Sequence, residues 1–385
     1  MRVVIVSRVY APEPGAATLR LSALERALVR RGLEVEVVTT QPPPGTALGT
    51  PDGSGQVQVR RWPALRDPAG YIRGYLPYAS FDIPAFWRVL LTHRPDVVVV
   101  EPPPTTGVAV RVATRLRRIP YVYYGADIWS EAAQSAQVPR LVVRALRAIE
   151  RWAWRGARAV ITVYPALQER MSRLAPGLNV RVVGHGADTT LFRPDGPRAA
   201  VERPYVVYAG TASEVHGAGI FVEAFHGVLT AVPDAMLVVL GQGEERAAME
   251  EAARNLPRGA TLFLGRLDPA TTAGWIRGAR AALASVRPGP YDFALATKVF
   301  AAAACGTPVL YAGPGDGGRL VEANALGWAV PYSVDAVRGA LVEALSAPRP
   351  PEVRDRLAVW AREHASLDAA ADRAADVVLS VARRA

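Results

Sequence analysis

Short apolar runs that alternate with helix-length segments constrain the fold of this chain more than any other feature. After the first run, the segment 16–31 places Leu21, Leu24 and Leu28 on one helical face, and Gly32 follows as a helix stop. Strands buried on both faces of a parallel sheet read this way, because helices connect them across the sheet. The pattern predicts an α/β fold. In the first half of the chain, strands are expected at Arg2–Ser7, Leu33–Thr39, Asp96–Val100, Tyr121–Tyr124 and Ala157–Val163.

The pattern restarts after Asp188–Pro204, a segment rich in Pro, Gly and Arg. The chain has 385 residues, which suits two domains better than one core. We therefore expect two Rossmann-like, doubly wound domains, residues 1–190 and 197–366. Ligands of such sheets bind beyond the carboxyl ends of the strands, so a cleft faced by both domains is the expected site. Further strands are expected at Tyr205–Ala209, Met236–Leu240, Thr261–Leu264, Ala281–Ser285 and Pro308–Ala312, and the last helices at Val353–His364 and Leu367–Arg383.

Composition excludes several classes of protein. Charged residues make up 21% of the chain and aromatic residues are spread along it, which excludes wholesale disorder. No apolar run reaches the ~20 residues of a membrane-spanning helix, and the N-terminal run is too short for a signal peptide. Cys305 is the one cysteine, the five histidines are scattered, and no Asp-x-Asp pair occurs. We expect a soluble, cytoplasmic protein that uses no metal and no bound cofactor.

Positive charge is concentrated in the first half of the chain. The net charge is +10: residues 1–196 contribute +11 and residues 197–385 contribute −1. This asymmetry indicates an anionic partner, such as a phosphorylated or lipid-linked acceptor or the inner membrane face, although a genome that favours Arg codons would also produce it. In the segment 140–158, six arginines share one ~80° helical sector. The opposite side carries Leu141, Ala145, Ile149 and Trp152. We interpret the arginines as a solvated face over a core-facing stripe, with peripheral membrane contact as the alternative.

Lys298 is the only lysine among 45 basic residues. It follows Thr297, a candidate N-cap, and precedes the predicted helix Val299–Cys305. A cation in the first helical turn opposes the helix dipole, and a bound anion would remove that conflict. A compact ammonium is also not interchangeable with a guanidinium where a point charge must fit. The pattern predicts a phosphate site at Lys298, with a solvated lysine as the alternative.

Glycine-rich turns follow three of the predicted strands in the second half. Glycine lets backbone N–H groups approach a ligand, and a following helix N-terminus favours anions. The last turn also satisfies Gly-x-Gly-x-x-Gly through Gly318, which leaves a dinucleotide-dependent oxidoreductase as an alternative. The turns contain Gly210, Gly241, Gly243, Gly313 and Gly315.

Six longer segments carry a resemblance to a known family: VYAPEPGAATLRLSALERALVRRGLEVEVVT, VRVVGHGADTTLFRP, VVYAGTASEVHGAGIFVEAF, LVVLGQGEER, TLFLGRLDP and ATKVFAAAACGTPVLYAGPG. In these segments the chain resembles the retaining glycosyltransferases of the two-domain GT-B fold, in the family 4-like group. The resemblance implies transfer of a sugar from a nucleotide diphosphate donor to an acceptor, with retention at the anomeric carbon and without metal. It also implies that the first domain, together with residues 367–385, binds the acceptor, and that the second domain binds the donor.

The resemblance assigns the donor contacts residue by residue. It places Lys298 on the family's phosphate-contacting lysine, and Arg266 and Leu267 beside the nucleobase. The loop at Gly15 would face the diphosphate. The remaining donor and phosphate residues are expected to be Gly210, Thr211, His216, Gly241, Gly243, Thr297, Gly313, Gly315 and Asp316.

The chain departs from the family at several positions. Ala301 stands where the family helix usually carries a Glu that binds the donor ribose. Thr211 and His216 stand where an Arg and a Lys often clamp the diphosphate, and His185 replaces an Asn before the hinge glycine. These departures motivate a second reading, a catalytically altered homologue that acts as a binding or activator protein.

Acceptor contacts are expected in the first half. Asp127 ends a predicted strand and can serve as a catalytic or acceptor contact, or only as a helix N-cap. The stretch 60–87 interleaves arginines with aromatic residues, a pattern that can cradle a sugar, stack bases or pack a loop. We expect Tyr71 and Tyr75 to contact the acceptor from an aromatic loop that extends to Phe81. No nucleic-acid motif accompanies this stretch, so nucleic acid is not an expected partner.

Overall fold

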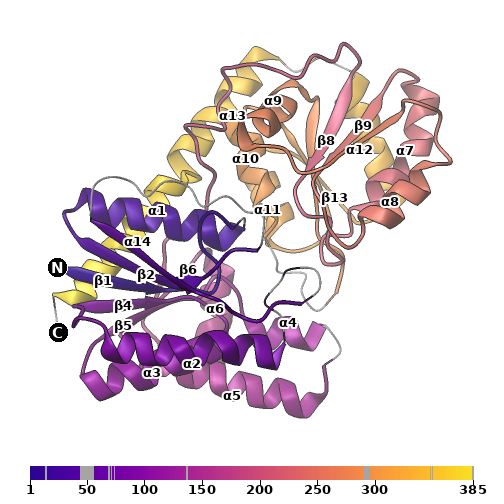
Figure 1. The fold of residues 1–385 in the computed structure, drawn as a ribbon. Coiled ribbons are helices and arrows are strands. Elements are labelled where there is room, and N and C mark those ends of the chain that lie inside the picture. The colour runs from indigo at the N-terminus through magenta and orange to yellow at the C-terminus, as the bar shows by residue number, and fades with distance from the viewer. Residues whose placement is uncertain are drawn as a thin grey trace. The chain divides into compact units, whose positions relative to one another are not determined.

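The computed structural model describes residues 1–13, 15–43, 56–67, 70, 72, 74–135, 138–289, 295–346, 348 and 350–383. The chain forms two compact units (Figure 1). Unit 1 comprises Met1–Gly184 and Leu367–Ala385, and unit 2 comprises His185–Ser366. Each unit has its own parallel sheet with helices on both faces, so the predicted α/β fold with two Rossmann-like domains is confirmed.

The sheet of unit 1 is parallel throughout its described strands. Its order is β3-β2-β1-β4-β5-β6-β7, with β1 in register between β2 and β4 through Val3–Val35 and Val3–Val97. Valines fill the central strands and are buried, as a sheet covered on both faces requires. The strands are β1 (Arg2–Val6), β2 (Glu34–Thr40), β3 (Val57–Trp62), β4 (Val97–Val100), β5 (Tyr121–Tyr124), β6 (Ala159–Thr162) and β7 (Val180–Val182).

Two layers of helices cover the sheet of unit 1. One layer consists of α2 (Tyr75–Leu91), α3 (Pro104–Arg117) and α5 (Arg140–Gly156), which pack side by side (Figure 1). The opposite layer includes α1 (Ala16–Arg30) and α14 (Leu367–Ala382), which pack on each other. The remaining helices of the unit are α4 (Trp129–Ser135) and α6 (Pro165–Leu174).

Helix α14 ties the end of the chain to unit 1. Its alanine-rich side is buried, and α14 contacts β4, β5 and β6. Arg31, just after α1, pairs with Asp372 at 2.6 Å and with Asp376 at 3.0 Å. Small side chains let the helix lie close to the sheet, and the ion pairs align it with α1.

Unit 2 repeats the plan with the described strand order β10-β9-β8-β11-β12-β13. The strands are β8 (Tyr205–Ala209), β9 (Met236–Leu240), β10 (Thr261–Leu264), β11 (Ala281–Ser285), β12 (Val309–Ala312) and β13 (Gly327–Val330). One core lies under α7 (Gly219–Ala231), α8 (Arg246–Ala253) and α12 (Val334–Ser346). The other lies under α9 (Pro269–Gly278), α10 (Lys298–Ala304), α11 (Asp316–Ala323) and α13 (Pro351–His364).

The sequence pattern predicts an aromatic loop that extends to Phe81, but the chain is helical from Tyr75 onward. The stretch 60–87 contains the end of strand β3 and most of helix α2, which tolerates Pro84 in its interior. Phe81 is fully buried, and its ring stacks on Trp62 with centroids 4.9 Å apart. Trp62 and Phe81 therefore pack the core between β3 and α2. Tyr71 lies outside the described residues. Of Tyr75 only the backbone, at the start of α2, is described.

The prediction of a core-facing stripe on α5 is wrong. Leu141 is 77% exposed and Trp152 is 42% exposed. The side that faces the core carries Val143, Ala153 and Trp154 instead. Helix α5 therefore packs on the core through a third side. This side lies roughly opposite the boundary between the arginines and the exposed apolar residues.

Candidate functional site

Lys298 opens α10 at the carboxyl edge of the unit 2 sheet, where the resemblance places a phosphate-contacting lysine. Its Nζ is buried and has no hydrogen-bond partner among the described residues. The ammonium instead lies over the ring of Tyr208, 3.7 Å from the ring centroid. Burial without a counter-charge lowers the pKa of Lys298 to about 7. A bound anion would raise this pKa again by stabilising the charged form.

Thr297 precedes Lys298 but does not cap α10. Its backbone is already helical, and its side chain makes no capping hydrogen bond. The predicted N-cap is wrong in this respect, because an N-cap residue needs extended backbone to turn its hydroxyl toward the helix N–H groups.

His216 lies next to Lys298 in unit 2. Its Nδ1 is 2.7 Å from Ser213 Oγ. Burial, together with the positive charge of Lys298, lowers the pKa of His216 to about 3. The imidazole is therefore neutral at ordinary pH, and it can bond to a phosphate oxygen only as a neutral donor. Thr211, in the same loop, is exposed.

The glycine turns bring separate loops of unit 2 into backbone contact. A Cβ at Gly241 would lie 2.2 Å from the carbonyl oxygen of Gly210, and a Cβ at Gly313 would lie 2.0 Å from that of Val286. Both glycines also have positive φ, 126° and 134°. Packing thus accounts for glycine at these positions whether or not a ligand is bound. The other turn glycines with positive φ are Gly210, Gly243 and Gly315.

Arg246 holds two of these turns together, and the sequence pattern did not single it out. Its guanidinium donates to the backbone oxygens of Gly241 and, at 2.7 Å, of Leu264. Leu264 ends β10, just before the predicted nucleobase contacts Arg266 and Leu267. Arg266 is exposed there, whereas Leu267 packs against the core.

Asp316 begins α11 after the turn at Gly315 and pairs with Arg319 of the same helix. Its carboxylate therefore already has a cationic partner. His185 lies elsewhere in unit 2, where its ring stacks on Phe300 with centroids 5.7 Å apart. The Nδ1 of His185 lies 2.7 Å from the backbone N of Gly186 and 3.2 Å from its carbonyl oxygen.

Polar side chains also meet at the carboxyl edge of the unit 1 sheet. Arg20 of α1 forms a buried ion pair with Glu101, 2.6 Å apart, and Ser7 Oγ donates to the same carboxylate at 2.9 Å. Asp127 follows β5 at this edge, and its charge acts on both Arg20 and Glu101. Only the parallel sheet brings these residues together. Sequence reasoning had identified Asp127 alone.

Gly15 lies in the loop before α1. Its backbone is extended, and the nearest atom to an added Cβ would be 4.0 Å away. The fold itself therefore does not require glycine there.

Among the described residues, no group of three or more His, Cys, Asp or Glu side chains is placed to hold a metal ion. None of the helices described is both long and apolar enough to cross a bilayer.

Comparison with known proteins identifies the fold and the family. Among solved structures, the chain is similar to a sucrose-phosphate synthase from Thermosynechococcus elongatus, with a TM-score of 0.76, 17% identity and all of both chains covered. It is also similar to WaaG, a glycosyltransferase involved in lipopolysaccharide biosynthesis, with a TM-score of 0.73, 16% identity, and 98% of this chain and 99% of WaaG covered. A third similar structure is HepE from Anabaena in complex with UDP and glucose, with a TM-score of 0.68, 16% identity, and 99% of this chain and 100% of HepE covered.

No curated protein matches the chain by sequence. Residues 15–186 match the family described as "Glycosyl transferase 4-like domain", and residues 203–347 match "Glycosyl transferases group 1". The first match covers most of unit 1 and the second most of unit 2, and they leave the oxidoreductase alternative without support. The chain belongs to the two-domain glycosyltransferases of the 4-like and group 1 families.

Proposed function

We propose that this chain transfers a sugar from a nucleotide diphosphate donor to an acceptor hydroxyl, with retention and without a metal. The observation that carries the proposal is the buried Lys298 ammonium, which has no hydrogen-bond partner among the described residues. A buried cation is costly unless an anion accompanies it. The diphosphate of the donor is an anion of the right kind, and HepE was solved with UDP-glucose as well as with UDP.

Unit 2 supplies the environment that the leaving diphosphate needs. As the bond between the anomeric carbon and the phosphate oxygen breaks, negative charge grows on that oxygen. Lys298 would stabilise this charge, and neutral His216 would add a hydrogen bond rather than a second charge. The ammonium takes the electrostatic role that a divalent cation plays in metal-dependent transferases.

The departing phosphate oxygen also accounts for the proton. In a retaining transfer the acceptor hydroxyl attacks from the face that the leaving group vacates. Its oxygen bonds to the anomeric carbon, and its proton passes to the phosphate oxygen. This step needs no separate protein base, which agrees with the low pKa of His216, about 3, because an imidazole with so low a pKa is a weak base.

Unit 1 would bind the acceptor. It carries most of the positive charge of the chain, and its sheet edge gathers Asp127, Arg20 and Glu101. We assign Asp127 an acceptor contact, because it is exposed whereas the Arg20–Glu101 pair is buried.

Replacing Lys298 tests the proposal. In Lys298→Ala the turnover number should fall by well over tenfold, because one preorganised donor to an oxyanion contributes about 2.7–4 kcal/mol. Lys298→Arg should recover little of the lost turnover, since the planar, forked guanidinium does not fit a site for a compact ammonium. The assay would pair a panel of UDP-, GDP- and dTDP-sugars with mass-spectrometric detection, and wild-type turnover should persist in EDTA.

The matched control is Arg258→Ala, which removes an exposed cation from the same unit and should leave turnover unchanged. Full turnover of Lys298→Ala would overturn the phosphate role. Nucleotide binding without turnover on any donor would favour the altered homologue that Ala301 suggests.

A further inference from the structure

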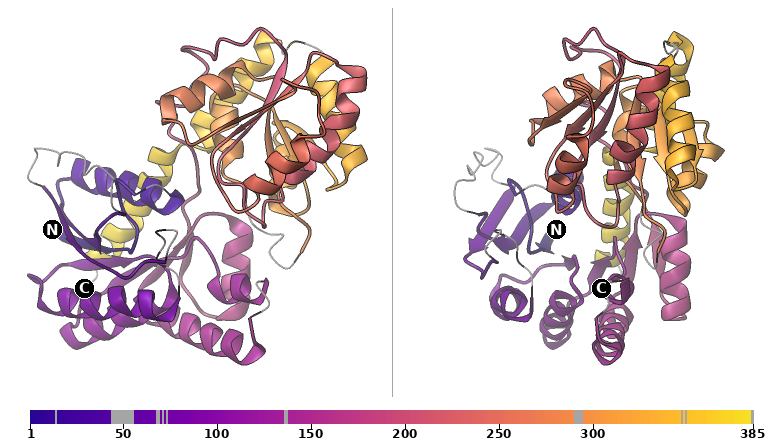
Figure 2. Two further views of the ribbon diagram at one scale, coloured as in Figure 1. Left: turned by 45° about the vertical axis from the view of Figure 1, so that its right-hand side comes forward. Right: turned by 90° about the vertical axis from the view of Figure 1, so that its right-hand side faces the viewer.

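The outer side of the helix layer α2–α3–α5 exposes large apolar residues. On α2, Trp87 is 53% exposed and Leu91 is 76% exposed. Figure 2 (right) views the three helices nearly end-on, in a row along one face of the unit 1 sheet. The exposed apolar residues of this face are Leu76, Ile83, Trp87, Leu91, Val112, Leu116, Leu141, Ile149 and Trp152. A monomer rarely leaves a patch of this kind on one side without a partner.

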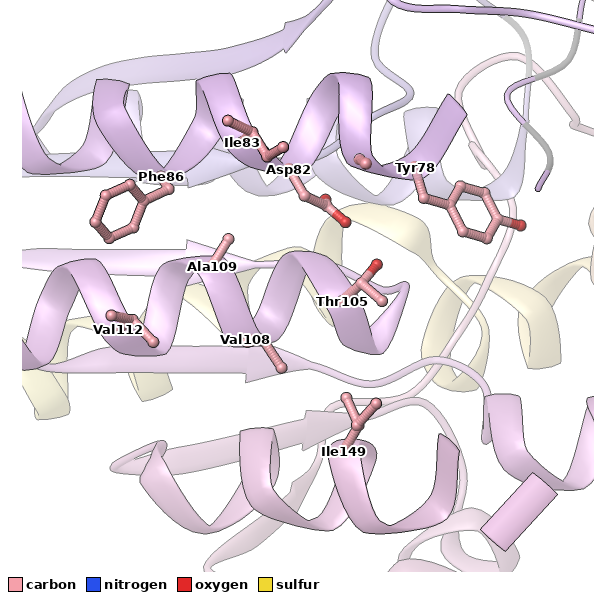
Figure 3. A pocket seen from close by; sticks show the side chains of 10 residues that line it. Tyr78, Asp82, Ile83, Phe86, Thr105, Val108, Ala109, Val112 and Ile149 are labelled. Atoms are coloured by element: carbon pink, nitrogen blue, oxygen red, sulfur yellow. The ribbon is translucent and has the colours of Figure 1, made fainter. Parts of the chain in front are cut away.

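A groove runs along this face between α2 and α3. Its volume is about 480 Å³, and Ile83, Phe86, Val108 and Val112 are among its lining residues. Figure 3 shows Phe86 directed from α2 toward α3, and Ile149 of α5 on the other side of α3. The lining is apolar over most of its length.

The same face carries positive charge without exposed negative charge. The three helices contain nine arginines and two carboxylates. Asp82 is 8% exposed and accepts a hydrogen bond from Thr106, and Glu150 is 1% exposed and caps the start of α4. Glu150 thus points into the protein, and Asp82, although it lines the groove between α2 and α3, is little exposed. The arginines are Arg88, Arg111, Arg115, Arg117, Arg140, Arg144, Arg147, Arg151 and Arg155.

Helix α5 shows the arrangement most clearly. Its core-facing sector packs through Trp154, while its exposed half is divided into an arginine stripe and an apolar stripe through Leu141 and Trp152. The apolar stripe faces α3, where Arg111 stacks over Trp152 at 4.0 Å from the ring centroid. A helix with this division can lie in a bilayer interface with its apolar stripe buried and its arginines at the headgroups.

We propose that the α2–α3–α5 face docks on an anionic phospholipid bilayer. Exposed tryptophans and leucines enter the headgroup region, and the arginines pair with lipid phosphates. Charge complementarity selects this partner over a second copy of the chain, because two such faces would bring the exposed Arg115, Arg140, Arg144 and Arg155 of each copy toward one another across one interface. The proposal concerns unit 1 alone and does not depend on the role of Lys298.

Vesicle flotation tests the proposal with the full chain. Wild-type protein should float with vesicles of equal parts phosphatidylcholine and phosphatidylglycerol, and should stay unbound with phosphatidylcholine alone. Near an anionic surface each arginine contributes about fivefold to affinity, so the triple change of Arg140, Arg144 and Arg155 to Gln should weaken binding about a hundredfold at low salt. Leu141→Gln with Trp87→Gln should weaken binding at every salt concentration, because it removes the apolar contribution.

Matched controls separate this face from general charge and hydrophobicity. Changing Arg193, Arg198 and Arg258 to Gln alters the net charge equally on exposed positions of unit 2, and Leu19→Gln removes an exposed leucine from α1, in the opposite helix layer of unit 1. These variants should float like wild type, and all variants should keep the wild-type circular dichroism spectrum. Equal flotation on neutral and anionic vesicles, or equal losses in control and test variants, would overturn the proposal. So would a concentration-dependent dimer that the Leu141 and Trp87 changes dissolve.

Discussion

Lys298 is held in an unfavourable electrostatic state, because its ammonium is buried without a counter-charge among the described residues. Its folded-state pKa is about 7, whereas an unburied lysine has a pKa of 10.5. Between these values the unfolded chain binds more protons than the folded chain, so this residue makes stability rise with pH in that window. The cost is present at neutral pH, where the nucleotide-free protein holds a partly charged group in an apolar setting. A site that destabilises the empty protein is typical of a group kept for binding.

Lys298→Met should therefore change the pH dependence of stability. The free energy of unfolding of nucleotide-free wild type should rise from pH 7 to pH 9 relative to Lys298→Met, by up to about 2.7 kcal/mol for two pH units. Urea unfolding at the two pH values measures the difference. Parallel pH profiles for the two proteins would mean that the ammonium is solvated in the free protein.

At the scale of elements, α2 decides what the aromatic stretch does. The helix buries Phe81 against Trp62 on one side and exposes Ile83 on the other. Two residues that are close in sequence thus serve the core and the surface of unit 1, since side chains two positions apart on a helix point to nearly opposite sides. The aromatic residues of this stretch are structural on the sheet side and available for contacts only on the outer side.

Phe81→Ala should destabilise unit 1 by about 3–5 kcal/mol, because it leaves a cavity next to Trp62. Ile83→Ala, on the same helix, should cost less than about 0.5 kcal/mol, as exposed substitutions do. Chemical denaturation followed by tryptophan fluorescence would report both changes. Similar losses for the two variants would show that α2 packs differently from the arrangement described.

At the scale of the whole molecule, the charge is divided between the two halves of the chain. Residues 1–196 carry a net charge of +11, and residues 197–385 carry −1. Exposed charges attract an anionic acceptor over distances that salt limits to about 10 Å at 0.1 M. The buried Lys298, by contrast, is shielded from bulk ions by the protein around it.

Raising the ionic strength should therefore weaken binding of the acceptor more than binding of the donor. We expect the apparent KM for an anionic or lipid-linked acceptor to rise steeply with salt, while the KM for the nucleotide sugar changes little. Steady-state kinetics across a salt series, with a neutral acceptor as control, measures both. A salt-independent KM for an acceptor that carries phosphate would assign the arginines to surface solvation alone.

The sequence determined most of the strands and their order along the chain, because these depend on local patterns, although β3, β7 and β13 were not predicted. Buried strands such as Tyr121–Tyr124 and Tyr205–Ala209 have the predicted bounds, since an apolar run between turn residues has few other solutions. Lys298 stood out in the sequence because one lysine among many arginines needs a reason.

Only the tertiary structure decided which residues meet and which helix faces are buried. Arg20 and Glu101 are 81 residues apart and pair because parallel strands end at one edge. Arg246 acts on two turns that the sequence does not connect. On α5, periodicity revealed two distinct stripes, but the side that faces the core depends on what α3 and the sheet present to it. Which side of a helix is buried depends on the elements that pack against it, so the sequence of one helix does not determine it.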